Sequence, residues 1–177
     1  LGPRAAGTYF KTTKPGLCIF NALTDDLNQL LERTGEPEIA ILLLSQSNID
    51  QCARDPIRSA TLNIDVTKQL ITEFGNRRIR VVYVSTDTVF DGESGGYTEV
   101  DQLRPILTYG RQKAEIEKYL LDNAPDSIIV RLPKVIGHDL ADGSIFAAWV
   151  ADLAQRKSIR LATDQFQSVI ALEDAIE

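Results

Sequence analysis

The sequence contains no methionine and only one histidine, two cysteines and one tryptophan among its 177 residues. The single histidine, His138, excludes a zinc site made of several histidines, and the two cysteines do not complete such a site. A histidine-based catalytic triad would need His138 as its base, but no nucleophile motif accompanies it. His138 is therefore expected to be a loop residue after Gly137. An open reading frame begins with methionine, so we expect a fragment, a processed chain or a sequence from which residues have been removed.

Long apolar runs and an excess of basic residues are also missing. No run approaches the roughly 20 apolar residues of a membrane-spanning helix, and no signal-peptide pattern opens the chain. The net charge of −6 argues against nucleic acid as a partner, because nucleic-acid-binding domains usually present a basic face. Cys18 and Cys52 are expected to be reduced thiols, the usual state in the cytoplasm. These absences predict a cytoplasmic protein without a metal, a membrane or a nucleic acid as partner.

Apolar runs alternate with helical patterns along the whole chain. Hydrophobic residues make up 44% and charged residues 25% of the sequence, which is ordinary for one globular domain of this length. Strands are expected over the apolar runs 17–22, 39–44, 79–85 and 127–132, with a further short strand over 159–162. Strands and helices that alternate at this spacing predict an α/β fold, a doubly wound parallel sheet with helices on both faces.

The segments between these runs predict helices. They are expected over 25–33, 56–74, 108–122 and 145–155, and a last helix begins near 172. Thr24 and Thr108 are the expected N-caps of the first and third helices. In the second helix, Ile57 and Phe74 are expected at the two ends of one apolar stripe.

The segment from Val81 to Lys113 carries the most chemistry. A buried strand ends in the hydroxyl residue Thr86, and a later helix carries Tyr109 and Lys113 four residues apart, which places both on one face. A phenol beside an ammonium is a proton donor of tunable pKa. A threonine hydroxyl nearby can hold the oxygen that receives the proton. These groups can reduce a carbonyl when a hydride donor lies alongside.

This segment and its neighbours resemble the extended short-chain dehydrogenase/reductases, and among them most the dTDP-4-dehydrorhamnose reductase group. The similar motifs are STDTVFDG at 85–92, YGRQK at 109–113, DQCARDP at 50–56, LNIDVTKQL at 62–70, VRLPKVIG at 130–137 and DQFQSVIALEDAI at 164–176. The resemblance implies a Rossmann-like NAD(P)-binding domain over 1–177, in which about 138–177 begins the substrate-binding part. It also implies NADPH or NADH as cofactor, a nucleotide-linked deoxysugar as substrate and a homodimer as the expected assembly.

The resemblance also implies a role for each residue of the motif. Tyr109 would donate the proton to the reduced carbonyl, and Thr86 would hold the substrate carbonyl for hydride attack. Lys113 would lower the pKa of Tyr109 and would hydrogen-bond the nicotinamide ribose. The residues expected to bind the cofactor are Tyr109 and Lys113 together with Gly2, Ser85 and Pro133.

The sequence departs from the family pattern at several places. Only Leu1-Gly2 resembles the tail of the family's glycine-rich turn, so the first strand and most of that turn are missing. Leu43 and Leu44 are bulkier than the small alanines that the family usually places there, and Lys134 stands where rhamnose reductases often carry tryptophan. The substrate subdomain is also expected to be incomplete at the C-terminal end.

Two other functions remain open from the sequence. One is a nucleotide-sugar epimerase or dehydratase of the same superfamily, although STDTVFDG favours a reductase. The other is a non-catalytic regulatory subunit that resembles the methionine adenosyltransferase beta subunit, to which RLP at 131–133 is equally similar. Asp87 and Asp91 are expected to serve local turns rather than catalysis, and Asn63 is expected to be structural.

Overall fold

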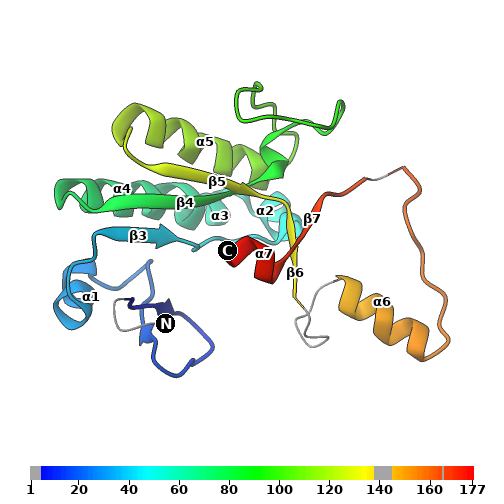
Figure 1. Ribbon diagram of the computed structural model, residues 1–177, viewed down its shortest axis with the longest axis horizontal. Coiled ribbons are helices and arrows are strands. Elements are labelled where there is room, and N and C mark those ends of the chain that lie inside the picture. The colour runs from blue at the N-terminus through cyan, green and yellow to red at the C-terminus, as the bar shows by residue number, and fades with distance from the viewer. Residues whose placement is uncertain (1–4, 138–144, 165) are drawn as a thin grey trace. The chain divides into compact units, whose positions relative to one another are not determined.

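The computed structural model describes residues 5–137, 145–164 and 166–177 and is drawn in Figure 1. The chain divides into two compact units, Leu1–Val130 and Arg131–Glu177, which are described in turn. Gly2 and His138 lie outside the described residues, so the predictions for these two positions stay predictions.

The first unit is built around the strand order β3-β4-β5, with β3 at Ile39–Leu42, β4 at Arg80–Thr86 and β5 at Ile128–Leu132. β3 and β4 are parallel, with Ile39 opposite Arg80. Figure 1 shows these strands side by side, and β5 runs on past the boundary between the units. Three of the predicted strands are thereby confirmed, because continuous aliphatic runs suit strands inside a parallel sheet.

A second, very small sheet precedes this one. β1 (Thr8–Tyr9) pairs in parallel with β2 (Cys18–Ile19). The strand expected over 17–22 is therefore only two residues long, because the chain turns at Asn21, whose carbonyl accepts from the N–H groups of Thr24 and Asp25 at 3.0 and 2.8 Å. Cys18 and Cys52 are not joined in a disulfide.

The first helix, α1 (Leu27–Thr34), begins two residues later than expected. Asp26, not Thr24, is its N-cap, since the Asp26 carboxylate accepts from the N–H of Asn28 at 2.8 Å. The Thr24 hydroxyl donates to Asp25 instead, so the predicted cap is wrong. Gly35 ends the helix at φ 80°, a left-handed conformation that glycine adopts without steric cost.

The helix expected over 56–74 is interrupted. After α2 (Ile49–Arg54), the chain forms α3 (Pro56–Ala60), a π-helical segment η1 (Thr61–Val66) and α4 (Thr67–Asn76). The Thr67 hydroxyl donates to the carbonyl of Leu62 at 2.9 Å, which supports the wider turn. Ile57 is 84% exposed, so the predicted apolar stripe does not include it. π-Helical turns are often found at functional sites.

The last helix of the unit is α5 (Thr108–Asn123). It follows a 3₁₀ turn, η2 (Asp87–Val89), and a loop in which the rings of Phe90 and Tyr97 stack 4.4 Å apart. Its N-cap is Leu107, without a side-chain bond, so Thr108 is the first helical residue rather than the predicted cap.

One core joins the helices to the sheet. Buried side chains of α1, α4 and α5 pack against the inner residues of β3 and β4, among them Ala40, Leu42, Val81 and Tyr83. Figure 1 shows α4 and α5 lying along these strands. Ile39, Ile41 and Leu43, which alternate with the buried residues, are exposed. Helices α1, α4 and α5 therefore pack on one face of the sheet, and the predicted α/β fold with a parallel sheet is confirmed. The expected helices on the other face stay a prediction.

The second unit contains β6 (Lys134–Ile136), α6 (Ile145–Ala154), β7 (Val169–Ala171) and α7 (Leu172–Ile176). β6 and β7 are parallel, with Lys134 opposite Val169. The strand expected over 159–162 is wrong, because β6 takes 169–171 as its partner and leaves 159–162 unpaired. Among the described residues of the whole chain, no helix is long and apolar enough to cross a membrane.

Candidate active site

The carboxyl end of β4 carries two buried hydroxyl residues, Ser85 and Thr86. The Thr86 Oγ1 accepts from the N–H of Thr88 at 3.2 Å and lies 3.2 Å from Asp87 Oδ1. Thr86 therefore caps the 3₁₀ turn that follows the strand. This bond fixes the hydroxyl at the end of the sheet where ligands of parallel α/β folds bind.

Gly110 brings the start of α5 against this turn. A Cβ at position 110 would overlap the carbonyl oxygen of Thr88 and would lie 3.0 Å from its carbonyl carbon. Only a glycine lets the helix approach the backbone of η2 this closely. Tyr109 is thereby placed beside the end of β4. We did not single out Gly110 from the sequence, although a glycine inside a helix is a signal of close packing.

The Tyr109 phenol is partly buried and faces groups from three other elements. Burial raises the pKa of Tyr109, and the thiol of Cys52 and the carboxylate of Asp87 raise it further. The nearby Ser45 hydroxyl lowers this pKa in part. The net direction is opposite to the lowering by Lys113 that the sequence led us to expect, because the loss of hydration outweighs the lowering by Ser45, and Lys113 is not among the groups that shift this pKa.

Lys113 is 3% exposed and lies under the carboxyl end of β4. Its ammonium donates to the carbonyl oxygen of Val84 at 2.6 Å and lies 4.1 Å from the ring centre of Tyr83. The ring face and the carbonyl both attract the positive charge. Burial nevertheless lowers the pKa of Lys113 to about 8, because an ammonium loses hydration inside the protein.

Glu117 lies one turn further along α5 and is 1% exposed. Its carboxylate accepts a hydrogen bond from the Ser85 hydroxyl and opposes the fall in the pKa of Lys113. A buried carboxylate of this kind helps the ammonium to stay charged. Glu117 did not stand out in the sequence. Because the Ser85 hydroxyl is directed at Glu117, the role of Ser85 in cofactor binding stays a prediction.

The structure thus gathers most of the predicted groups at one edge of the first unit. Thr86, Tyr109 and Lys113 all lie around the end of β4, and Ser45, which the sequence reasoning missed, joins them from the loop after β3. Pro133 follows β5 in the second unit, and its contact with a cofactor stays a prediction.

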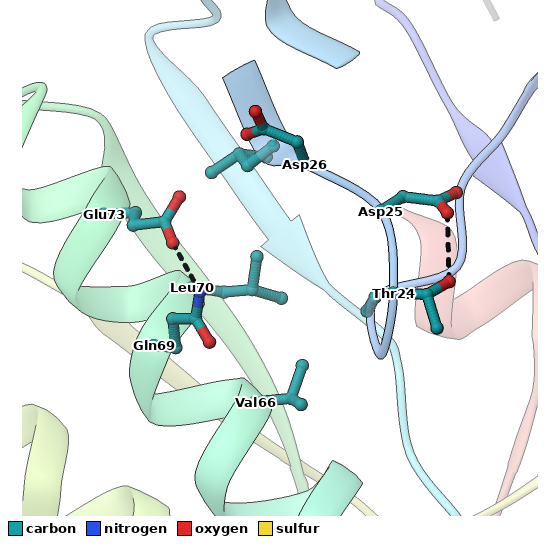
Figure 2. Close-up of a pocket in the computed structure, with 9 residues that line it drawn as sticks. Thr24, Asp25, Asp26, Val66, Gln69, Leu70 and Glu73 are labelled. Atoms are coloured by element: carbon teal, nitrogen blue, oxygen red, sulfur yellow. Dashed lines mark hydrogen bonds between the residues drawn. The ribbon is translucent and has the colours of Figure 1, made fainter. Parts of the chain in front are cut away.

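A hollow of about 270 Å³ lies elsewhere in the first unit, between α1 and α4. Figure 2 shows residues of the loop before α1 facing residues of η1 and α4, with Thr24, Asp25, Asp26, Val66, Gln69, Leu70 and Glu73 labelled. Its three carboxylates would repel phosphate. Asp26 caps α1, and Glu73 accepts from Gln69 at 2.8 Å. We therefore assign this hollow no part in the proposed chemistry. Within the described residues, no group of three metal-ligating side chains is present.

Comparison with known protein families gives one decisive match. The family described as the RmlD substrate-binding domain matches residues 24–173. The chain belongs to the RmlD substrate-binding domain family. The match includes β4, η2 and α5, so the candidate site lies inside the part of the chain that defines this membership.

Three relatives of this RmlD-family chain illustrate its range. It is 34% identical to the probable low-salt glycan biosynthesis reductase Agl14 of Haloferax volcanii, over 79% of this chain and 49% of the relative. It is 31% identical to a dTDP-4-dehydrorhamnose reductase of Aggregatibacter actinomycetemcomitans, over 70% of this chain and 42% of the relative. It is 27% identical to methionine adenosyltransferase 2 subunit beta of Danio rerio, over 75% of this chain and 41% of the relative. The chain spans about half the length of these relatives or less.

Solved structures agree with the Rossmann-like fold. A dTDP-4-dehydrorhamnose reductase from Clostridium acetobutylicum superposes with a TM-score of 0.62 at 26% identity, over 73% of this chain and 45% of that one. A UDP-N-acetylglucosamine 4-epimerase from Methanobrevibacter ruminantium superposes with a TM-score of 0.76 at 20% identity, over 89% of this chain and 54% of the epimerase. The second likeness shows the shared α/β fold and nothing about the reaction.

Proposed function

We propose that this protein reduces a keto group on a nucleotide-linked deoxysugar with NADPH or NADH, and that Tyr109 donates the proton. The observation that carries the proposal is the fixed placement of Tyr109 and Lys113 at the end of β4. The Gly110 contact holds the start of α5 there, and the bond from Lys113 to Val84 holds the next turn. Similarity to a dTDP-4-dehydrorhamnose reductase supports the substrate class.

The side chains at this edge of the sheet fit the nicotinamide half of such a cofactor. Ligands of open parallel sheets lie outside the carboxyl ends of the strands, where Thr86 and Tyr109 supply hydroxyl groups and Lys113 an ammonium. When bound, the cofactor supplies the hydride that attacks the carbonyl carbon. The predicted contacts of Gly2, Ser85 and Pro133, and the choice between NADPH and NADH, are parts of this proposal.

The electrostatics of the site suit a proton donor. A donor must be protonated before the reaction, and burial keeps the Tyr109 phenol so by raising its pKa. With a pKa of about 8, Lys113 is about 90% charged at pH 7. Its positive charge stabilises the phenolate that remains when the proton leaves. Thr86 donates to the carbonyl oxygen and so holds the oxygen that receives this proton.

Two alternatives share the fold or the family. An epimerase or dehydratase has the same α/β fold, as the superposed epimerase shows, so the fold does not separate it from a reductase. Such an enzyme returns its cofactor to the starting oxidation state. A regulatory subunit is favoured by the 27% identity to the methionine adenosyltransferase subunit, and it would turn over no keto sugar. A homodimer stays a prediction under each of these functions.

The test is oxidation of NADPH or NADH by the full-length protein in the presence of dTDP-4-dehydrorhamnose. Tyr109→Phe removes the proton donor and should lower kcat about 10²- to 10⁴-fold. Tyr119→Phe is the matched control, because Tyr119 lies on the same helix and its hydroxyl bonds only with the surface residue Thr72, at 2.8 Å. Turnover that Tyr109→Phe leaves undiminished would defeat the proposal. Absence of any net oxidation, with exchange of label into the sugar, would favour the epimerase.

A further inference from the structure

Gln112 is a buried polar residue inside the YGRQK motif, and no step of the proposed reaction uses it. It is 5% exposed and lies about one helical turn after Tyr109 on α5. Its Oε1 accepts from Asn63 Nδ2 at 2.7 Å, and its Nε2 donates to Ser59 Oγ at 2.8 Å and to the Pro56 carbonyl at 3.3 Å. Because an amide nitrogen can only donate and a carbonyl oxygen can only accept, these partners fix the orientation of the amide.

Asn63 carries this contact to the loop that follows β3. It is 2% exposed and projects from the π-helical turn η1. Its Oδ1 accepts from the N–H of Gln46 at 2.7 Å, and its Nδ2 donates to the Gln46 carbonyl at 3.0 Å. The Cys52 thiol donates to the same carbonyl at 3.1 Å. One buried side chain thus holds both polar backbone groups of Gln46, and the expected structural role of Asn63 is confirmed in this form.

The amide network joins two sides of the candidate site. The loop after β3 leaves the sheet at the same carboxyl edge as Thr86, because β3 and β4 are parallel neighbours. Ligands of open parallel sheets lie along this edge. The hydrogen bonds from Gln46 through Asn63 to Gln112 therefore set the separation between this loop and α5. Within the described residues, every buried side-chain nitrogen and oxygen has a partner, so displacing either element would leave a buried polar group unpaired.

Gln112 also fixes the rotation of α5 about its own axis. Neighbouring residues of an α-helix point about 100° apart, so Gln112 and Lys113 reach different partners. Lys113 donates to the Val84 carbonyl on β4 at 2.6 Å, whereas Gln112 bonds with η1 and α3. A helix held on two sides cannot turn without breaking one of these contacts. Tyr109, about one turn earlier on the same helix, is held with it.

We propose that Gln112 is a positioning residue that sets the rotation of α5 and, through Asn63, the place of the loop after β3 relative to Tyr109. The coupling of helix and loop stands on the contacts alone, whereas its effect on turnover rests on the proposed function. Gln112 acts only through Tyr109 and the backbone of Gln46. Removing its amide should therefore slow the reaction without abolishing it.

Hydrogen exchange at the backbone N–H of Gln46 tests the coupling without any turnover. In Gln112→Leu, Asn63 loses a partner, and this N–H should exchange about 10-fold faster than in the wild type. Gln112→Glu at about pH 5 should keep most of the protection, because one of its oxygens still accepts from Asn63. Gln29→Glu makes the same chemical change at an exposed position of α1 and is the matched control, which should leave the exchange unchanged.

Gln112→Glu also supplies a pH-dependent rescue. A protonated carboxyl has the shape of an amide, and its O–H can donate to the Pro56 carbonyl as Nε2 does. The ionised carboxyl has no proton to donate, and burial raises its pKa above the roughly 4.3 of an exposed glutamate. This variant should therefore resemble the wild type at about pH 5 and Gln112→Leu at about pH 8.

Kinetics of the full-length protein test the effect on turnover. Gln112→Leu should lower kcat about 10- to 100-fold, under conditions where urea unfolding shows that the variant is folded. The ratio of kcat in Gln112→Glu to kcat in the wild type should fall as the pH rises from about 5 to 8, and the ratio for Gln29→Glu should stay constant. A purely structural role would change the free energy of unfolding and leave both kcat and this ratio unmoved.

The outcomes separate this inference from the proposed reduction. Exchange at Gln46 in Gln112→Leu equal to that in Gln29→Glu would overturn the inference, and so would an unchanged kcat while Tyr109→Phe is inactive. Faster exchange together with a fully active Tyr109→Phe would keep the coupling and refute the proposed reduction. If Gln112→Leu does not fold, the ratio for Gln112→Glu decides, and a ratio that is constant with pH overturns the inference.

Discussion

Replacing Gly110 by alanine should separate α5 from the turn after β4. The added methyl would overlap the Thr88 carbonyl oxygen and would lie 3.0 Å from its carbon and 3.2 Å from Pro105 Cβ. Carbon atoms pack best at about 3.5–4.0 Å, and a backbone carbonyl cannot swing aside as a flexible side chain can. The start of α5, with Tyr109, must therefore move outward by about 1 Å.

The size of the effect follows from two opposing contributions. Overpacking at a tight contact costs about 1–3 kcal/mol, and alanine stabilises a helix interior by about 1 kcal/mol relative to glycine. With a rigid neighbour we expect a net loss of about 1–2 kcal/mol in the free energy of unfolding. A shift of about 1 Å in a reacting group should also lower kcat/KM about 100-fold.

Gly75→Ala is the matched control for this variant. Gly75 is also helical, but a Cβ there would meet nothing within 4 Å. This variant should gain up to about 1 kcal/mol, so the two should differ by about 1–3 kcal/mol in urea unfolding. If Gly110→Ala is as stable as Gly75→Ala, the close approach of α5 to Thr88 is not real, and the placement of Tyr109 derived from it fails.

Two further predictions concern buried groups. The pKa of Lys113 is about 8 in the folded protein and near 10.4 in an unfolded chain. Between these two pH values the unfolded state binds more protons than the folded state. The free energy of unfolding should therefore rise with pH across this window, by about 3 kcal/mol at most. Urea unfolding from pH 7.5 to 10.5 should show this rise in the wild type and not in Lys113→Met; equal pH dependence in both proteins would contradict the assignment. Cys52 is 0% exposed, whereas Cys18 is partly exposed. A thiol reagent should therefore label Cys18 quickly and Cys52 only when the protein unfolds. Rapid labelling of Cys52 would contradict its burial.

The sequence predicted the elements around the site because their signals are local. Continuous aliphatic runs marked β3 and β4, and a helical pattern marked α5 together with the spacing of Tyr109 and Lys113. Element ends were less predictable, since Asp26 and Thr24 are both good N-caps and only the folded geometry selects Asp26. The strand expected over 159–162 failed because strand formation depends on a partner that the local sequence does not reveal.

The contacts that complete the site had no local signal. Ser45, Asn63 and Gln112 come from three separate segments, and their bonds exist only once β3, η1 and α5 are packed together. The π-helical turn that aims Asn63 at the loop interrupts a segment that reads as one continuous helix. The direction of the Tyr109 pKa was misjudged for the same reason, because burial is a property of the fold.

Transfer of deuterium from NADPH or NADH labelled at C4 of the nicotinamide is the most direct test of the central claim, that Tyr109 protonates a carbonyl which accepts a hydride. A single turnover of the full-length protein with dTDP-4-dehydrorhamnose should place one deuterium on the former carbonyl carbon, and Tyr109→Phe should do so at less than about 1% of the wild-type rate. A sugar product without deuterium, or labelling at the wild-type rate in Tyr109→Phe, would contradict it.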